Sequence, residues 1–259
     1  MLTKRQHSGT KHAVIPDVQA KPGVSNEHMA HVGEYLAEKR PDVWVLIGDA
    51  ADMPSLSSYD IGKKSYEGRT YKADIEAHLA SMEKLMAPTE RYNKSRKRRG
   101  LRPYRPRKVV TLGNHEQRIL RAVEIDRKLD GTIKMADLQF DNFGFEEFPF
   151  LEIVRIDGIE YSHYFTSGVM GRPVTSAAAL LRERQGSATM GHVQWTDIAI
   201  HKKTQKRAMF CGACYTHDED YLGPQGNDCR RQIVMKHEVK DGRYNLLEVS
   251  LSYLKRRYG

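Results

Sequence analysis

Cysteines are few in this sequence, and long apolar runs and an apolar leader are missing. Three cysteines in 259 residues cannot build a disulfide framework, which predicts a protein of a reducing compartment. No run approaches the roughly 18 consecutive apolar residues of a membrane span, and residues 1–12 lack the apolar core of a signal peptide. We therefore expect a cytoplasmic protein without a membrane partner. The oligomeric state stays open.

Acidic residues are missing from one internal stretch, residues 91–108. This stretch carries ten basic residues, and without them the net charge of +9 would become −1. It indicates either a solvated loop or a surface that contacts the phosphate backbone of nucleic acid, with Tyr92 and Tyr104 stacking on bases. Under the second interpretation DNA is the expected partner, and the candidate contacts are Arg96, Lys97, Arg98 and Arg99.

The length suits one domain with a sizeable core. We expect residues 1–259 to form that domain, with residues 1–12 as a basic tail and residues 91–108 as a basic insertion.

Two short apolar runs near the start predict buried strands with a helix between them. Residues 13–15 are followed by Asp17 and Gln19, and residues 43–47 are followed by Gly48, Asp49 and Asp52. Between them, Ser25 can cap a helix whose apolar residues fall on one face. Because a strand-helix-strand unit makes its two strands parallel neighbours, Asp17 and Asp49 should lie at the same end of a sheet.

A third strand, residues 107–111, ends in the most informative stretch of the chain. Gly113-Asn114-His115-Glu116 follows it, and a helix is expected from Gln117, with Arg118 one turn beyond the motif and able to reach a phosphate. Open α/β sheets place their chemistry at such carboxyl ends, and a histidine there can carry a proton near neutral pH. A loop over residues 54–69 and a helix with its apolar face at residues 75–86 precede the basic stretch.

The second half of the chain is predicted to be mainly β. Asp157-Gly158 is a hairpin signal between strands at residues 151–156 and 159–165, and the second of these carries His163. A further strand leads into Gly191-His192-Val193-Gln194. Helices are expected at residues 132–140 and 175–184, and strands at residues 207–211, 232–239 and 244–251.

A zinc site is a weaker alternative near the end of the chain. Cys211 and Cys214 have the spacing of a zinc knuckle, with His217 and Cys229 nearby, but the usual second pair is missing. Buried small residues near a strand end are the competing interpretation.

Five polar motifs at five predicted strand ends together resemble the calcineurin-like metallophosphoesterase family. The family pattern is Asp-x-His, Gly-Asp-x-x-Asp, Gly-Asn-His-Glu, a lone His and Gly-His-x-His, in this order. The resemblance covers residues 13–200, and the first motif and the basic insertion are similar to members encoded by bacteriophages. It implies an α/β fold, an αββα sandwich of two mixed β-sheets flanked by helices, and for a phage protein the host cytoplasm.

The resemblance also implies two divalent metal ions. The first would take Asp17, Gln19, Asp49 and Gln194, and the second Asp49, Asn114, His163 and His192. His115 matches the catalytic histidine of the family, and Asp52 the carboxylate that orients it.

The chain departs from the family pattern at Gln19 and Gln194, where the family has histidine. Both changes fall on the first metal, whose ligands become almost all oxygen, and such ligands suit Mn²⁺ or Mg²⁺ better than Zn²⁺. This site is expected to bind more weakly or only with substrate, or to be lost. Zn²⁺ or Fe suits the Asn114/His163/His192 site.

The resulting hypothesis is a metal-dependent phosphoesterase, specifically a phosphodiesterase or nuclease acting on DNA. A phosphomonoesterase acting on nucleotides or proteins is the first alternative. A degenerate member that binds a partner without catalysis is the second, although a scaffold has no need of the Asp52–His115 pair.

Overall fold

The structure is a computed structural model that describes residues 9–219 and 227–259. Its centre is a six-stranded mixed sheet in the order β13-β12-β1-β2-β3-β4. The strands β1, β2, β3 and β4 run parallel, whereas β12 and β13 are antiparallel to their neighbours. Their bounds are β1 Thr10–Ile15, β2 Val43–Leu46, β3 Arg107–Thr111, β4 Glu146–Phe148, β12 Gln232–Lys240 and β13 Arg243–Ser250.

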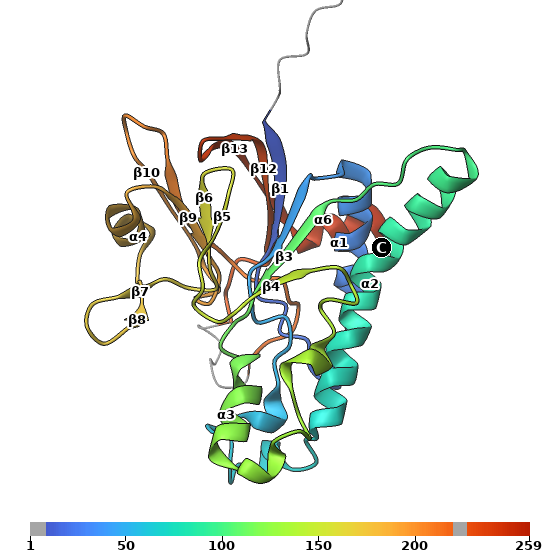
Figure 1. Ribbon diagram of the computed structural model, residues 1–259, viewed down its shortest axis with the longest axis vertical. Coiled ribbons are helices and arrows are strands. Elements are labelled where there is room, and N and C mark those ends of the chain that lie inside the picture. Colours follow the sequence, from blue (N-terminus) through green and yellow to red (C-terminus); the bar gives the residue numbers. More distant parts are fainter. Residues whose placement is uncertain (1–8, 220–226) are drawn as a thin grey trace, which may run out of the picture.

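A second, five-stranded mixed sheet has the order β10-β11-β9-β6-β5. Its strands are β5 Val154–Ile156, β6 Ile159–Tyr161, β9 Ser187–Met190, β10 Thr196–Ile200 and β11 Arg207–Cys211. β6, β9 and β11 are parallel, and β5 and β10 are antiparallel edge strands. A small hairpin of β7 (Thr166–Ser167) and β8 (Arg172–Pro173) extends from this half of the molecule (Figure 1).

Helices cover the outer faces of both sheets, which makes four layers (Figure 1). On the six-stranded sheet lie α1 (Glu27–Lys39), α2 (Tyr71–Arg98) and α6 (Leu251–Tyr258), and on the five-stranded sheet lies α4 (Ala177–Arg184). α3 (Gln117–Ile125) follows β3, and short 3-10 turns occupy Pro54–Leu56, Lys64–Tyr66, Arg127–Leu129 and Met135–Leu138. The predicted αββα sandwich is thus present.

The apolar core is divided in the same way as the layers. Ala13, Ile15 and Trp44 face the helices, whereas Val14 and Val45 face the second sheet. This alternation follows from the two-residue period of a strand whose two faces are both covered. A third cluster lies between the second sheet and α4. In the part of the chain that the structure describes, no helix is long and apolar enough to cross a membrane.

Several predicted boundaries need correction. The tail predicted for residues 1–12 is wrong for Thr10–His12, which pair with β2 and β12 in β1; residues 1–8 lie outside the described residues. The helix predicted at residues 132–140 is only the 3-10 turn Met135–Leu138, closed by Gln139 at φ +54°. Leu251, predicted to end a strand, begins α6 because the Ser250 hydroxyl caps the Tyr253 amide.

The basic insertion predicted for residues 91–108 is also corrected. Residues up to Arg98 continue α2, and Arg107 begins β3, so only residues 99–106 lie between elements. This connection is tied to the helix: the Asn93 side chain donates to the Tyr104 carbonyl oxygen (2.9 Å) and accepts from the Tyr104 amide (2.7 Å).

Lys236 on β12 is a fully buried lysine between the two sheets. Its Nζ lies 4.5 Å from the ring centre of Tyr161 and 4.7 Å from that of Tyr244, and it donates to the Thr189 hydroxyl. Burial lowers the pKa of Lys236 to about 7, so the folded chain loses this proton well before the unfolded chain does. The charged form therefore opposes folding at neutral pH.

Lys236→Met is expected to raise the free energy of unfolding at pH 7, by about 1.4 kcal/mol for each unit by which folding lowers the pKa. The unfolded lysine keeps its proton up to about pH 10. The advantage of the methionine variant over wild type should therefore shrink as the pH rises from 7 to 10. Urea denaturation across that range measures it, with the exposed Lys240→Met as control. An advantage independent of pH would contradict this account.

Candidate metal centre

The polar strand ends of both sheets meet at one edge of the sandwich. Parallel pairing of β1, β2 and β3 brings the segments with Asp17, Asp49 and Asn114 together. Parallel pairing of β6 and β9 does the same for His163 and His192 on the second sheet. The two sets face each other, because the Asp17 carboxylate accepts a hydrogen bond from the His192 amide at 3.1 Å.

Glycines allow the close approach of these segments. A Cβ at Gly113 would lie 2.1 Å from Oδ1 of Asp49, and a Cβ at Gly191 would lie 2.3 Å from Oδ1 of Asp17. Any side chain at these two positions would therefore push a candidate ligand away. The glycines of the Gly-Asn-His-Glu and Gly-His motifs have a steric role in building the site.

The backbone is strained at four of the predicted ligands. Gln19, Asp49, His192 and Gln194 have φ values of +46°, +48°, +69° and +63°. Such values are costly for residues other than glycine and cluster at functional sites when the surrounding fold enforces them.

Asp49, His163 and His192 form a group with metal-binding geometry. One potential ligand atom of each lies within 4.8 Å of those of the other two. His163 donates from Nδ1 to the Ile47 carbonyl oxygen at 2.9 Å, which leaves Nε2 facing Oδ2 of Asp49 at 3.3 Å. Asn114 joins them, because its Oδ1 lies 2.9 Å from Nε2 of His163. A partner on Nδ1 that orients the ring is usual for a metal-binding histidine.

The charges of this group are balanced by a proton in the absence of a cation. Burial opposes the charged form of His163, but the Asp49 carboxylate raises the pKa of His163 to about 10. Burial, together with the positive His163, lowers the pKa of His192 to about 4, so His192 is neutral and keeps a lone pair for a cation. A positive charge is therefore favoured between Asp49 and Asn114, and a metal ion held there would supply one.

The other predicted ligands leave buried oxygens without donors. Oδ2 of Asp17 and Oε1 of Gln19 are buried and accept no hydrogen bond from any residue between 9–219 or 227–259. Burial also raises the pKa of Asp17, as expected for a carboxylate that lacks a cation. Gln194 differs, because its Oε1 accepts a hydrogen bond from the Tyr215 hydroxyl at 2.8 Å. The residues fit a cation at Asp17 and Gln19, with Gln194 held by Tyr215.

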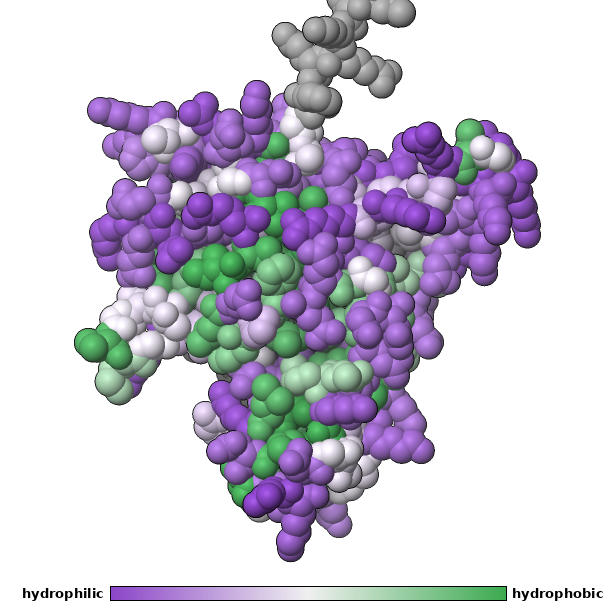
Figure 2. Space-filling view, viewed as in Figure 1, coloured by the Kyte–Doolittle hydropathy of each residue, from purple (hydrophilic) through white to green (hydrophobic). Residues whose placement is uncertain are grey.

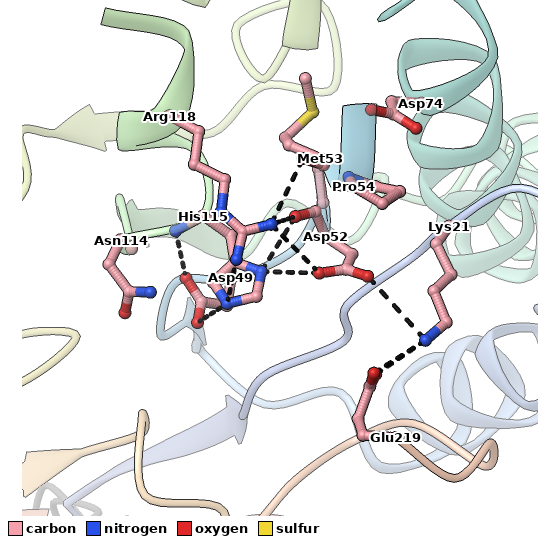
Figure 3. A network of polar contacts seen from close by, with 12 residues as sticks. Lys21, Asp49, Asp52, Met53, Pro54, Asp74, Asn114, His115, Arg118 and Glu219 are labelled. Carbon is pink, nitrogen blue, oxygen red and sulfur yellow. Dashed lines mark hydrogen bonds and ion pairs between the residues drawn. The ribbon is translucent and has the colours of Figure 1, made fainter. Parts of the chain in front are cut away.

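His115 and Asp52 form the expected pair (Figure 3). Nδ1 of His115 lies 2.8 Å from Oδ1 of Asp52, and Nε2 points toward Asp49, 3.8 Å from its Oδ2. Burial lowers the pKa of His115, but the carboxylates of Asp49 and Asp52 outweigh it and raise the pKa overall. His115 is therefore oriented and can carry a proton beside the metal-binding group.

Arg118, which was predicted to lie one helical turn beyond the Gly-Asn-His-Glu motif, contacts both residues of this pair. Its Nη1 donates to the Asp52 carbonyl oxygen at 2.8 Å, and its Nη2 lies 3.3 Å from Nε2 of His115 (Figure 3).

Four contributors to the site were not predicted. Lys21 lies 3.9 Å from Oδ2 of Asp52 and 2.9 Å from Oε1 of Glu219. The buried Glu116 carboxylate accepts hydrogen bonds from the amides of Asp49, Ala51 and Gly113, which joins two of the motifs. Tyr215 is the fourth. Only Glu116 had a sequence signal, since it belongs to the Gly-Asn-His-Glu motif.

A cleft of about 1020 Å³ opens in front of this group. Asn114, His115, Arg118 and His192 are among the residues that line it. Another wall belongs to the loop between β2 and α2.

The basic candidates Arg96, Lys97, Arg98 and Arg99 are not brought to the cleft. Thr70 and Ala73 at the start of α2 line the cleft, whereas Arg96, Lys97 and Arg98 end this 28-residue helix and Arg99 follows it, about 40 Å away at 1.5 Å per residue. Figure 1 shows α2 running away from α3, and Figure 2 shows that its far end is mostly hydrophilic.

The two tyrosines of the basic stretch are engaged within the chain. Tyr104 accepts from the Trp44 indole at 2.9 Å and donates to the Pro41 carbonyl oxygen, and Tyr92 binds Arg40 and Arg96. The prediction that Tyr104 stacks on bases is wrong, because its ring packs against the core.

The zinc alternative finds no support in the described part of the chain. Cys211 and Cys214 are buried as small core residues, and His217 is paired with Glu219 at 2.7 Å. Among the described residues, the group of Asp49, His163 and His192 is the one that meets the geometry of a metal site.

Comparisons with known proteins add little. No family model matches the chain, and no curated protein matches it. Two solved structures align with 93% of this chain and 99% of their own. One is a crystal structure at 11% identity with a TM-score of 0.40. The other is wild-type Vps29 complexed with zinc from Entamoeba histolytica, at 10% identity with a TM-score of 0.38. At these values the alignments support no inference about function.

Proposed function

We propose that this chain is a metal-dependent phosphoesterase of the calcineurin-like metallophosphoesterase type. The observation that carries the proposal is the convergence, at one strained edge, of two unpaired buried oxygens, the Asp49/His163/His192 group and the oriented Asp52–His115 pair. Each of these three features, taken alone, also fits a purely structural role. Together they match a site that holds divalent cations beside a proton donor.

Asp49 lies between the two halves of the site and would be shared by two cations. Asp17 and Gln19 would hold one of them, with Gln194 within reach of the same position by resemblance. Asn114, His163 and His192 would hold the other. Such a pair of cations clamps the oxygens of a phosphate ester and makes water a better nucleophile.

The protein's own groups supply orientation and a proton. Asp52 holds His115 with Nε2 toward the metal-binding group, where the imidazolium can donate to a leaving oxygen. Arg118 presents a guanidinium next to Nε2 of His115 and can bind a phosphate oxygen there. Its hydrogen bonds to the carbonyl oxygens of Asp52 and Met53 preorganise it.

The proposed substrate is DNA, hydrolysed as a phosphodiester. The position of the basic stretch supports a polymer rather than a mononucleotide. A separation of about 40 Å spans about 12 base pairs of duplex at 3.4 Å per base pair. Only a polymer could contact Lys97, Arg98 and Arg99 while one of its phosphates occupies the cleft.

A substrate panel with Mn²⁺ tests this function. Bis-p-nitrophenyl phosphate, p-nitrophenyl phosphate, and labelled single- and double-stranded DNA would be compared. Turnover of the diester and of DNA is expected. Turnover of the monoester alone would instead indicate a phosphomonoesterase, and turnover of none would indicate a binding protein with this fold.

The two metal positions are expected to differ in affinity. Two Mn²⁺ should bind, more weakly at Asp17 and Gln19, because amide oxygen replaces imidazole nitrogen there. Calorimetric titration measures both steps. Gln19→His should tighten the weaker step, whereas Gln205→His, at an exposed residue with φ +59°, should change neither. Two equally tight Zn²⁺ sites in the wild type would refute this difference.

Neutralising Lys97, Arg98 and Arg99 to glutamine is expected to weaken duplex binding. The slope of log affinity against log salt should fall by about 1 for each phosphate that these side chains no longer neutralise. Turnover of a dinucleotide should not change, because it cannot span about 40 Å. Fluorescence anisotropy with a duplex of about 20 base pairs measures the slope, with Lys202→Gln/Lys203→Gln as a matched surface control. An unchanged slope would leave the stretch as a solvated surface.

A further inference from the structure

One wall of the cleft is a loop in which several polar side chains are used internally. Asp60 binds Lys63 at 2.7 Å and Arg69 at 2.8 Å, and Arg69 also donates to the Pro54 carbonyl oxygen at 3.1 Å. Tyr66 donates to the Ser55 carbonyl oxygen at 2.7 Å. These contacts anchor the loop to the segment that follows Asp52, so side-chain interactions fix the shape of this wall.

Tyr59 is an aromatic residue of this wall that does not take part in these contacts. Its side chain is 80% exposed, lines the cleft, and has no hydrogen-bond or ring partner among residues 9–219 and 227–259. Ile61, two residues on, is 70% exposed. Tyr59 and Ile61 are therefore not part of the core. An exposed aromatic ring such as that of Tyr59 offers a flat face on which a ligand can stack.

The charges of the cleft indicate what kind of group would occupy this face. Four cationic and four anionic side chains line the cleft: Lys21, Lys63, Arg69 and Arg118, and Asp52, Asp60, Glu67 and Glu219. The charges of these eight side chains therefore cancel, so they add no net positive charge that would hold a second phosphate. Its volume of about 1020 Å³ is far more than one phosphate needs and suits an organic group.

We propose that the cleft between His115 and Tyr59 binds the base of a nucleoside esterified to the reacting phosphate, with the base stacked on Tyr59. This rests on the proposed phosphoesterase function and names the group that the site recognises. His115 and Tyr59 both line the cleft. The nucleoside assigned to this cleft is the one on the leaving side, whose oxygen would receive the proton of His115.

Two dinucleotide substrates test this directly: thymidylyl-thymidine and the same molecule with abasic sugars. Stacking on an aromatic side chain is worth about 1–3 kcal/mol per base, so Tyr59→Ala should raise KM for the dinucleotide roughly 5- to 150-fold. The same variant should leave KM for the abasic substrate unchanged. Products would be separated by chromatography in the presence of Mn²⁺.

Two further variants complete the test. Tyr59→Phe keeps the ring and should behave as wild type. Tyr253→Ala removes a partly exposed tyrosine from α6, outside the cleft, and should change nothing. An equal effect of Tyr59→Ala on both substrates, or no effect on either, would overturn the proposal.

The two proposals fail in different ways. Base recognition alone is refuted if wild type hydrolyses bis-p-nitrophenyl phosphate but has the same KM for the dinucleotide and the abasic substrate. It is also refuted if wild type hydrolyses bis-p-nitrophenyl phosphate but leaves the dinucleotide intact. Wild type that hydrolyses no phosphate ester refutes both.

Discussion

His115→Ala is expected to lower kcat by about 10²–10⁴-fold while KM and the number of bound metal ions stay close to wild type. The reason is that His115 would act on charge that develops only in the transition state. Its ring contacts Asp52 and Arg118 and is not part of the Asp49/His163/His192 group. Steady-state kinetics with bis-p-nitrophenyl phosphate, with metal content measured on the same samples, checks both parts.

Asp52→Asn is a second variant that tests the same pair. It leaves His115 present but removes the charge that orients and supports its protonated form, so a smaller loss of kcat is expected. Full kcat in His115→Ala would show that the catalytic assignment is wrong. The fold would then belong to a binding protein.

Asp49→Asn is expected to remove metal binding and activity together, with a loss of activity beyond about 10⁴-fold. Asp49 is the ligand proposed to be shared by both cations, and its Oδ2 faces His163 at 3.3 Å, so one neutral oxygen in its place should weaken both proposed metal positions. Metal analysis after dialysis, together with kinetics, measures the two losses. Asparagine is preferred to alanine because it preserves the volume and can still accept from the His115 amide.

Asp74→Asn is the matched control for this change. Asp74 is a fully buried carboxylate whose Oδ2 accepts from the Ser55 amide, and it is outside the metal-binding group. Its substitution should leave metal content intact. If Asp49→Asn retained both ions, Asp49 would not be shared between them.

The arrangement of the strand ends could be predicted because local rules determine it. Apolar runs at residues 13–15 and 43–47, with a helix between them, require parallel neighbours, and this parallel pairing is confirmed. The polar residues directly after each run then meet at one edge, which is why Asp17 and Asp49 lie close together. The remaining candidate site residues were predicted from the order of the five motifs along the chain.

Contacts between distant parts of the chain could not be predicted in this way. Lys21 meets Glu219 across 198 residues, and Tyr215, which belongs to none of the five motifs, holds Gln194. The position of the basic stretch relative to the cleft could not be predicted either. Its charge was visible, but α2 continues past Pro88 to Arg98 and places that charge about 40 Å from the cleft.

The most direct test of the metal-dependent phosphoesterase assignment is the titration of metal-stripped protein with Mn²⁺, following turnover of bis-p-nitrophenyl phosphate and bound metal in the same samples. We expect no turnover without metal, and activity that rises as the second equivalent binds at Asp17 and Gln19. Turnover that is equal with and without Mn²⁺, or saturated binding of both ions without any turnover, would contradict the assignment.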